Sequence, residues 1–367
     1  MTDHELPEQD PRRRTMPAGH VLLGIFIAFA VAALLNAQGM HKTALSQSPG
    51  FGRDVAATLT AGLAEVSGLL QIDEPRHLFK AALGRGDDDV ISTKVVFAPT
   101  VNTAPNKPAQ PVKPAKPNQP AKPAKPVKPT FSPQNKLRLY LTGDSLITDP
   151  ATIVLDRLAD NPAVKPVANA DPHAATGLIQ PAVFNWFTYL PKQIAELNPD
   201  LTVFTIGAND GQGFTGVTGG EEFGSPAWKT EYRRRVAGVM GELMAKGGRV
   251  VWLGLPITRD PDLAKRWALM NEIQKSEAAK YPGKVVYVNL FDRFKDAKGN
   301  YADYLPDASG QQQLVRAPDG IHYSAAGAGI VATAILKAID ELVTLSATNP
   351  PPAVPTKPKT TTTTTSP

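Results

Sequence analysis

The sequence contains no cysteine, and this excludes a disulfide framework, a thiolate nucleophile, a thiolate zinc site and an iron–sulfur cluster. Histidine is also scarce, because only His173 and His322 occur between residues 136 and 346. With no H-E-x-x-H pattern beside them, we expect neither a metal ion nor an organic cofactor. An excess of basic charge is missing too: residues 136–341 hold 22 Lys plus Arg and 23 Asp plus Glu, which disfavours a nucleic-acid partner.

A long apolar run near the N-terminus predicts a membrane anchor. Between Arg14 and Lys42 there is no Asp, Glu, Lys or Arg, and the centre of this stretch reads VLLGIFIAFAVAALL. A helix over residues 16–40 is long enough to cross a bilayer. Three arginines precede it, so the positive-inside rule places residues 1–15 in the cytoplasm and the rest of the chain outside. A cleaved signal peptide is the alternative, but residues 35–37, Leu-Asn-Ala, do not match a small-x-small cleavage site.

Residues 41–95 are predicted to be a helical juxtamembrane segment. Apolar residues recur at helical spacing from Val55 to Leu70, which predicts an amphipathic helix over residues 52–71. Such a helix can dock a membrane partner, for example a membrane acyltransferase. It can also pack on its own domain or lie on the lipid surface.

Two further segments have a composition that cannot form a core. Residues 96–135 repeat the Lys-Pro dipeptide six times, which predicts an extended polyproline II linker that acts as a spacer. At about 3.1 Å per residue, roughly thirty such residues reach about 90 Å. Binding of the lysines to an anionic wall polymer or lipid is the alternative function. Residues 347–367 are rich in Pro and Thr and are predicted to be a disordered tail, with attachment of glycans as the alternative.

The segment 136–346 alternates apolar strands with helical patterns. This alternation predicts an α/β fold of the doubly wound type, a three-layer sandwich with a central parallel sheet. The expected strands are 137–142, 164–168, 201–206, 249–255 and 284–290, and the expected helices are 150–158, 187–197, 227–245, 262–279 and 324–343. In such folds the site lies beyond the carboxyl ends of the strands, so reactive side chains are expected there.

Several strand ends carry residues that can act together on an ester. Ser145 follows the first strand at the turn into a helix, where an exposed hydroxyl fits a nucleophile. Asn209 follows the third strand, and its amide suits donation to a developing oxyanion. Asp319 precedes His322 by three residues, a spacing that lets the carboxylate orient the imidazole as a general base. His173 is the alternative base.

These residues stand in four blocks that resemble those of the SGNH (GDSL) hydrolase superfamily. The first block is Gly143-Asp144-Ser145-Leu146, the second is represented by Thr176-Gly177, the third is Gly207-Ala208-Asn209-Asp210, and the fourth is Asp319 with His322. The blocks occur in the order of the family. The N-terminal anchor together with Phe184-Asn185-Trp186 resembles a membrane-anchored bacterial branch of this superfamily.

The resemblance implies an SGNH or flavodoxin-like fold and an acyl-serine mechanism. Ser145, Asp319 and His322 would form the catalytic triad. The N–H groups of Ser145 and Gly177, together with the Asn209 amide, would form the oxyanion hole. Further substrate contacts are expected from five residues, which are Asp144, Thr176, Asp210, His173 and Trp186. The loop over residues 211–225 would be a lid or a simple surface loop.

Together with the predicted location, this site predicts an extracytoplasmic serine esterase of the cell envelope. Its substrates would be O-acyl esters, above all O-acetyl esters, of a wall polymer, an exopolysaccharide or a glycolipid. An O-acyltransferase that moves the acyl group to a sugar hydroxyl would use the same residues and is one alternative. A non-catalytic carbohydrate-binding or wall-associated scaffold is another, because a hydrolase fold does not guarantee turnover.

Overall fold

The chain forms two compact units, residues 1–92 and residues 93–367, called here the helical unit and the α/β unit. The computed structural model describes residues 17–46, 51–69, 95, 97, 128–211 and 222–348. Four predicted segments therefore lie wholly or largely outside the described residues: the cytoplasmic tail 1–15, the linker 96–135, the loop 211–225 and the C-terminal tail 347–367.

The helical unit contains the predicted membrane-spanning segment. Its described helices are α1 (Ala18–Leu35), α2 (Ala37–Ser46) and α3 (Phe51–Leu69). α1 buries no side chain and is long and apolar enough to cross a membrane. The predicted span 16–40 is interrupted, because Asn36 leaves helical geometry with φ −114° and ψ 17° and a new helix begins after it. An asparagine side chain competes for backbone hydrogen bonds, which favours such a break.

The predicted amphipathic helix packs inside its own unit. Thr60 of α3 lies with its hydroxyl 3.1 Å from His41 Nδ1 of α2. About two turns further along α3, the Ser67 hydroxyl donates to the Leu34 carbonyl of α1 over 2.8 Å. Ser67 is fully buried, so α3 meets its neighbours through small and polar side chains.

The α/β unit is built on a parallel sheet. Its strand order is β3 (Val164–Pro166), β2 (Leu137–Gly143), β5 (Leu201–Thr205), β6 (Arg249–Leu253) and β7 (Val285–Val288), and β4 (Asp171–Pro172) pairs with the end of β2. The first strand of the sheet thus lies between the second and the third, as in flavodoxin-like folds. This order confirms the predicted doubly wound sandwich.

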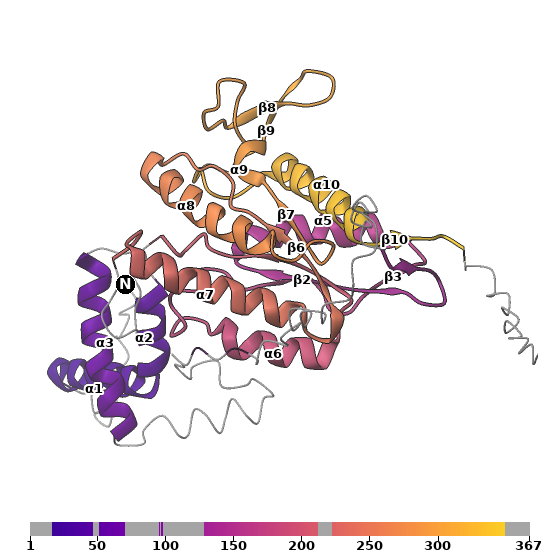
Figure 1. Cartoon of the computed structure of the whole chain (residues 1–367). Helices are drawn as coiled ribbons and strands as arrows, with labels where there is room; N and C mark the ends of the chain where they lie inside the picture. Colours follow the sequence, from indigo (N-terminus) through magenta and orange to yellow (C-terminus); the bar gives the residue numbers. More distant parts are fainter. Residues whose placement is uncertain are drawn as a thin grey trace, which may run out of the picture. The chain divides into compact units, whose positions relative to one another are not determined.

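Helices cover both faces of this sheet (Figure 1). On one face lie α5 (Thr148–Leu158) and α10 (Ala325–Leu342), and on the other lie α6 (Trp186–Leu197), α7 (Pro226–Leu243) and α8 (Pro261–Ala278). Shorter helical turns are η1 (Ser145–Ile147), η2 (Ala245–Gly247) and α9 (Leu290–Arg293). Side-chain caps begin α7, α8 and α10, where Ser225, Asp260 and Ser324 each accept a backbone N–H of the first turn.

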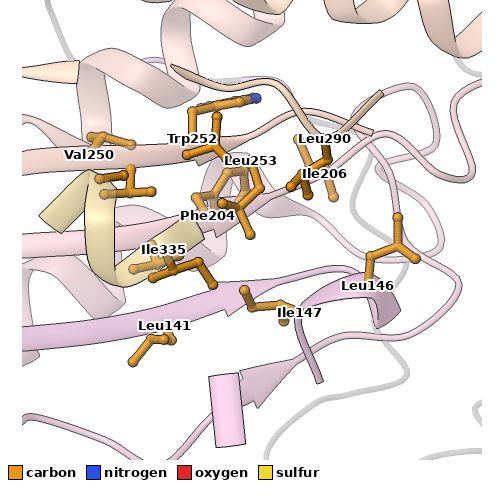
Figure 2. Close-up of a cluster of buried hydrophobic side chains, with 14 of the residues drawn as sticks. Leu141, Leu146, Ile147, Phe204, Ile206, Val250, Trp252, Leu253, Leu290 and Ile335 are labelled. Carbon is orange, nitrogen blue, oxygen red and sulfur yellow. The ribbon is translucent and has the colours of Figure 1, made fainter. Parts of the chain in front are cut away.

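Apolar side chains fill the space on both sides of the strands. Leu141 of β2, Phe204 of β5 and Trp252 of β6 are fully buried. Figure 2 shows them in one cluster with Ile147 of η1 and Ile335 of α10. Because both faces are covered, the strands read in the sequence as nearly continuous apolar runs.

Two short strand pairs have no counterpart among the predicted elements. β1 (Thr130–Phe131) runs parallel to β10 (Thr344–Leu345), so the segment before β2 and the segment after α10 lie side by side. β8 (Tyr304–Pro306) and β9 (Gln312–Leu314) form an antiparallel hairpin that projects from the unit (Figure 1). Strands of two or three residues leave no periodic pattern to recognise.

Close packing at the start of α10 yields the first prediction. A Cβ on Gly327 would lie 1.9 Å from the carbonyl oxygen of Val315, whereas a Cβ on Gly329 would meet nothing nearer than 3.7 Å. We expect Gly327→Ala to lower the free energy of unfolding by about 1–3 kcal/mol through overpacking. Gly329→Ala should leave it unchanged or raise it, since alanine favours helix. Thermal unfolding of both variants checks this, and equal effects at the two positions would contradict the packing.

Candidate active site

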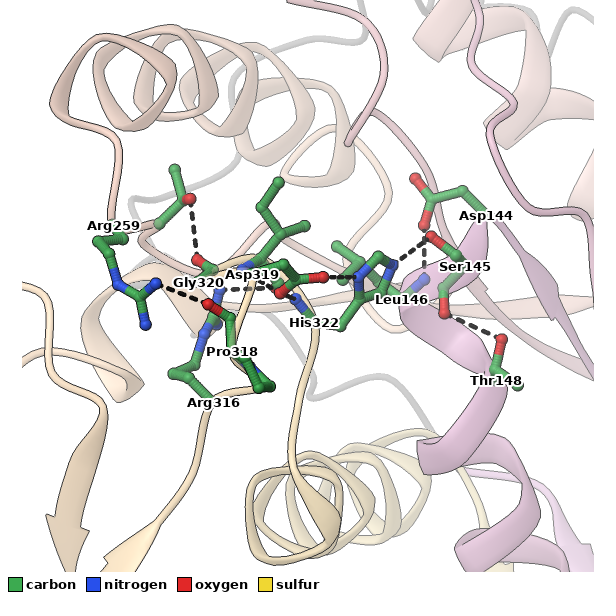
Figure 3. A network of polar contacts seen from close by, with 12 residues as sticks. Asp144, Ser145, Leu146, Thr148, Arg259, Arg316, Pro318, Asp319, Gly320 and His322 are labelled. Carbon is green, nitrogen blue, oxygen red and sulfur yellow. Dashed lines mark hydrogen bonds and ion pairs between the residues drawn. The ribbon is translucent and has the colours of Figure 1, made fainter. Parts of the chain in front are cut away.

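A serine, a histidine and an aspartate form a chain at the carboxyl edge of the sheet (Figure 3). Ser145 Oγ lies 2.8 Å from His322 Nε2, and His322 Nδ1 lies 2.6 Å from Asp319 Oδ2. Ser145 begins η1 directly after β2, whereas Asp319 and His322 precede α10. The carboxylate assigns the ring proton to Nδ1, which leaves Nε2 free of a proton and facing the serine.

Asp319 is held as a carboxylate by its own loop. Its Oδ1 accepts the backbone N–H groups of Ile321 and His322 over 2.8 Å and 2.9 Å, while Oδ2 accepts from the imidazole. Burial acts to raise the pKa of Asp319, but these hydrogen bonds outweigh it and lower the pKa to about 2. The loop therefore presents an ionised group that can stabilise an imidazolium.

The Asp144 side chain links the turn that begins with Ser145 to the turn that follows β5. This side chain is fully buried, and its two oxygens accept the N–H groups of Leu146 over 3.0 Å and Ala208 over 3.1 Å. Burial raises the pKa of Asp144 to about 7, although the two N–H groups act against the shift. We predicted a substrate contact here, but the carboxylate points inward and fixes backbone instead.

The Asp210 side chain likewise accepts backbone N–H groups, here those of the loop that carries Gly177. It is fully buried, and it accepts the N–H groups of Leu178 over 3.0 Å and Ile179 over 3.1 Å. Burial raises its pKa to about 6. A Cβ at Gly177 would lie 2.0 Å from Asp210 Oδ1, so only glycine fits beside this carboxylate. Asp210 is thus a support of the loop and not an exposed substrate contact.

Asn209 and Trp186 both contact Thr176, the residue before this glycine. Asn209 Nδ2 donates to the Thr176 carbonyl over 2.9 Å, and Trp186 Nε1 lies 3.2 Å from the Thr176 hydroxyl. Trp186 is fully buried and Thr176 is 4% exposed. Trp186 and Thr176 were both predicted to contact substrate. Their side chains instead contact each other, next to the Thr176 carbonyl that accepts from the Asn209 amide.

His173, the alternative base, belongs to a separate aromatic cluster. Its Nε2 lies 3.1 Å from Asp171 Oδ1, and its ring stacks on Phe184 with centroids 4.1 Å apart. Asp171 also accepts the hydroxyls of Tyr140 and Tyr189. Burial acts to raise the pKa of Asp171, but the hydrogen bonds from His173 and the two tyrosines lower it to about 2. Among the residues that the structure describes, no three His, Asp or Glu side chains lie together in a way that could hold a metal ion.

Arg316, which was not among the predicted site residues, lies beneath the loop that carries Asp319 and His322 (Figure 3). This guanidinium is 1% exposed and donates to the Gly320 and Ile321 carbonyls over 3.1 Å and 2.6 Å. It lies 5.4–5.6 Å from the centroids of three aromatic rings, those of Phe294, Tyr301 and Tyr323. No carboxylate within the described ranges pairs with it, so ring faces and loop carbonyls hold the charge. The signal in the sequence was an arginine between the apolar pairs Leu314-Val315 and Ala317-Pro318, three positions before Asp319.

The family of this chain follows from a comparison of sequences. The model of one family, described as a protein of unknown function (DUF459), matches residues 138–338. The chain belongs to this family. The match runs from β2 to α10 and includes the whole triad, whereas no curated protein matches the chain.

Solved structures similar to this DUF459 protein have low sequence identity to it. A candidate SGNH hydrolase from Slackia heliotrinireducens is 22% identical with a TM-score of 0.37, and the alignment covers 56% of this chain and 100% of that one. A GDSL-like lipase from Bacteroides thetaiotaomicron VPI-5482 is 16% identical with a TM-score of 0.40, covering 60% and 93%. An acetylxylan esterase from Geobacillus stearothermophilus is 15% identical with a TM-score of 0.39, covering 57% and 97%. The strand order and the placement of the four blocks, described above, are those that the SGNH resemblance implies.

The raised pKa values of Asp144 and Asp210 predict how stability depends on pH. A carboxyl whose pKa is higher in the folded state stabilises the fold while it is protonated, and this stabilisation is lost as pH rises through about 6 and 7. We therefore expect the melting temperature to fall between about pH 4, near the pKa of an unfolded aspartate, and about pH 7. Asp210→Asn should make this decrease smaller, whereas Asp262→Asn, an exposed control, should not change it. Parallel curves for the wild type and Asp210→Asn would contradict the assignment.

Proposed function

We propose that this DUF459 protein is an extracytoplasmic serine esterase that acts on O-acyl, chiefly O-acetyl, esters through an acyl-serine intermediate. The observation that carries the proposal is the unbroken chain of hydrogen bonds from Asp319 through His322 to Ser145. This order of acid, base and nucleophile is what removal of a serine proton requires.

The reaction begins when Ser145 Oγ attacks the ester carbonyl and His322 Nε2 takes its proton. Asp319 stabilises the resulting imidazolium through Nδ1. The imidazolium then gives its proton to the departing alcohol, which leaves an acyl group on the serine. Water, deprotonated by the same histidine, attacks this acyl group, and the bond between the acyl carbon and Ser145 Oγ breaks. The carboxylic acid leaves, and His322 returns the proton to Ser145 Oγ.

The developing oxyanion needs donors that are fixed before the reaction starts. We assign the N–H groups of Ser145 and Gly177 and the Asn209 amide to this task. The buried carboxylates of Asp144 and Asp210 support the assignment, because each bonds to backbone beside these donors. The bond from the Asn209 amide to the Thr176 carbonyl orients the amide plane.

Exposure of the triad supports a substrate with a large alcohol part. The side chains of His322 and Asp319 are 44% and 47% exposed, so the leaving-group side of the site is open to solvent. An acylated wall polymer, exopolysaccharide or glycolipid can approach such a surface. The apolar helix α1, with three arginines before it in the sequence, supports a location outside the cytoplasm.

The test is turnover of p-nitrophenyl acetate and labelling by a fluorophosphonate probe, with the full chain in detergent micelles. Ser145→Ala should abolish labelling, and both Ser145→Ala and His322→Gln should lower kcat/KM at least about 1000-fold. His173→Gln is the matched control and should retain activity, because its ring pairs with Asp171. Full turnover by folded Ser145→Ala would overturn the proposal. Transfer of acetyl to an added oligosaccharide would identify an acyltransferase in place of an esterase.

Arg316 gives a prediction about the positioning of the base. One nitrogen of Arg316, Nη2, donates to both loop carbonyls, while the planar group lies against aromatic rings. Lysine keeps the charge but lacks the planar group that holds a nitrogen at this position. Since misplacement of a reacting group by about 1 Å can cost about 100-fold, we expect Arg316→Lys to lower kcat by about 10- to 100-fold with little change in KM. Arg157→Lys, on the surface between α5 and α10, is the control. An unchanged kcat in Arg316→Lys would show that the loop holds its geometry without the guanidinium.

A further inference from the structure

An aromatic residue from the region preceding the Lys/Pro repeats is seated on the α/β unit. The ring of Phe97 lies edge-on to Phe187 of α6, with centroids 5.5 Å apart and an interplanar angle of 86°. The Arg234 guanidinium of α7 lies 4.7 Å from its centroid. Both contacts are favourable for an aromatic ring and are made by two different helices.

The surface under this ring is shaped to receive it. A Cβ at Gly238, in the middle of α7, would lie 1.9 Å and 2.0 Å from two ring carbons of Phe97. Glycine inside a helix is unfavourable relative to alanine, so its presence here calls for a reason, and the ring supplies one. The pocket around the ring is lined by further residues of the same two helices, which are Trp186, Leu190, Pro191, Val239 and Glu242.

The other end of the Lys/Pro-rich segment is fixed to the same unit. Lys128 Nζ donates to the Asp340 carbonyl of α10 over 2.7 Å. The Thr344 N–H donates to the Pro129 carbonyl over 2.9 Å, next to the pairing of β1 with β10. Residues 98–127 therefore connect two positions on one unit, Phe97 and Lys128.

We propose that Phe97 and its seat between α6 and α7 form a clip that attaches the chain to the α/β unit ahead of the Lys/Pro repeats. The chain would then meet the α/β unit both before and after the repeats, so the repeats would not contribute the length that the sequence analysis expects of a spacer. Only residues 70–96 would separate α3 from this attachment point, with a maximum extended length of about 90 Å instead of about 200 Å for residues 70–127. This inference does not depend on ester hydrolysis.

A double-mutant cycle on the full chain in detergent micelles tests the clip. In the wild-type background Gly238→Ala should lower the melting temperature of the α/β unit, because the added Cβ displaces the ring of Phe97. In the Phe97→Ala background the same substitution should raise it, since the collision is gone and alanine favours helix. Gly241→Ala, in the same helix with nothing within 4 Å of its Cβ position, should raise it in both backgrounds. An effect of Gly238→Ala that keeps its sign and size in both backgrounds would overturn the clip.

The absence of native cysteine allows a second, independent measurement. The Cγ atom of Phe97, whose place a cysteine sulfur would nearly take, lies 2.8 Å from the Cβ position of residue 238. Phe97→Cys with Gly238→Cys should therefore form a disulfide on mild oxidation. Phe97→Cys with Gly329→Cys, on α10 across the sheet, is the control pair and should not. Equal cross-linking of the two pairs, or none in either, would show that Phe97 does not occupy this seat in solution.

Discussion

The candidate site depends on one buried carboxylate shared by two turns. Asp144 accepts one N–H from the turn that begins with Ser145 and another from the turn that leads to Asn209. The two strands before these turns are direct neighbours in the sheet, and Gly143 approaches Thr205 so closely that a Cβ there would lie 2.2 Å from its carbonyl. Nucleophile and amide are therefore fixed to each other before any substrate binds. Burial raises the pKa of Asp144 to about 7, which is the energetic cost of this arrangement.

The loop that carries His322 rests on a buried cation. Arg316 is buried under that loop, and its guanidinium holds the Gly320 and Ile321 carbonyls. The Gly320 carbonyl also accepts the Thr258 hydroxyl over 3.0 Å, so one backbone oxygen of the loop is held from two directions. Buried aspartate side chains thus order the serine side, and a buried guanidinium orders the histidine side. The hydrogen bond between Ser145 and His322 joins the two halves.

The fold and the triad could be predicted because their signals are strong. Parallel strands buried on both faces leave continuous apolar runs, and the spacing of Asp319 and His322 suffices to place a carboxylate beside an imidazole. Burial of individual loop residues leaves no such signal. Asp144 and Asp210 therefore read as possible substrate contacts, whereas the structure turns both toward backbone N–H groups. The same reason explains why Arg316 was missed, since its partners are ring faces and carbonyls distributed over the chain.

Chemistry and access are determined by different parts of this molecule. Under the proposed function the triad attacks an acyl carbon, and the 44% exposure of the His322 side chain leaves room for alcohols of different sizes. Selection must then come from which esters can reach the site. Under the proposed function, such access depends on the length of chain between the apolar helix α1 and the α/β unit. The contacts of Phe97 with α6 and α7 affect this length. If the chain is attached at Phe97, the Lys/Pro repeats no longer contribute to the length of chain that links the α/β unit to α3.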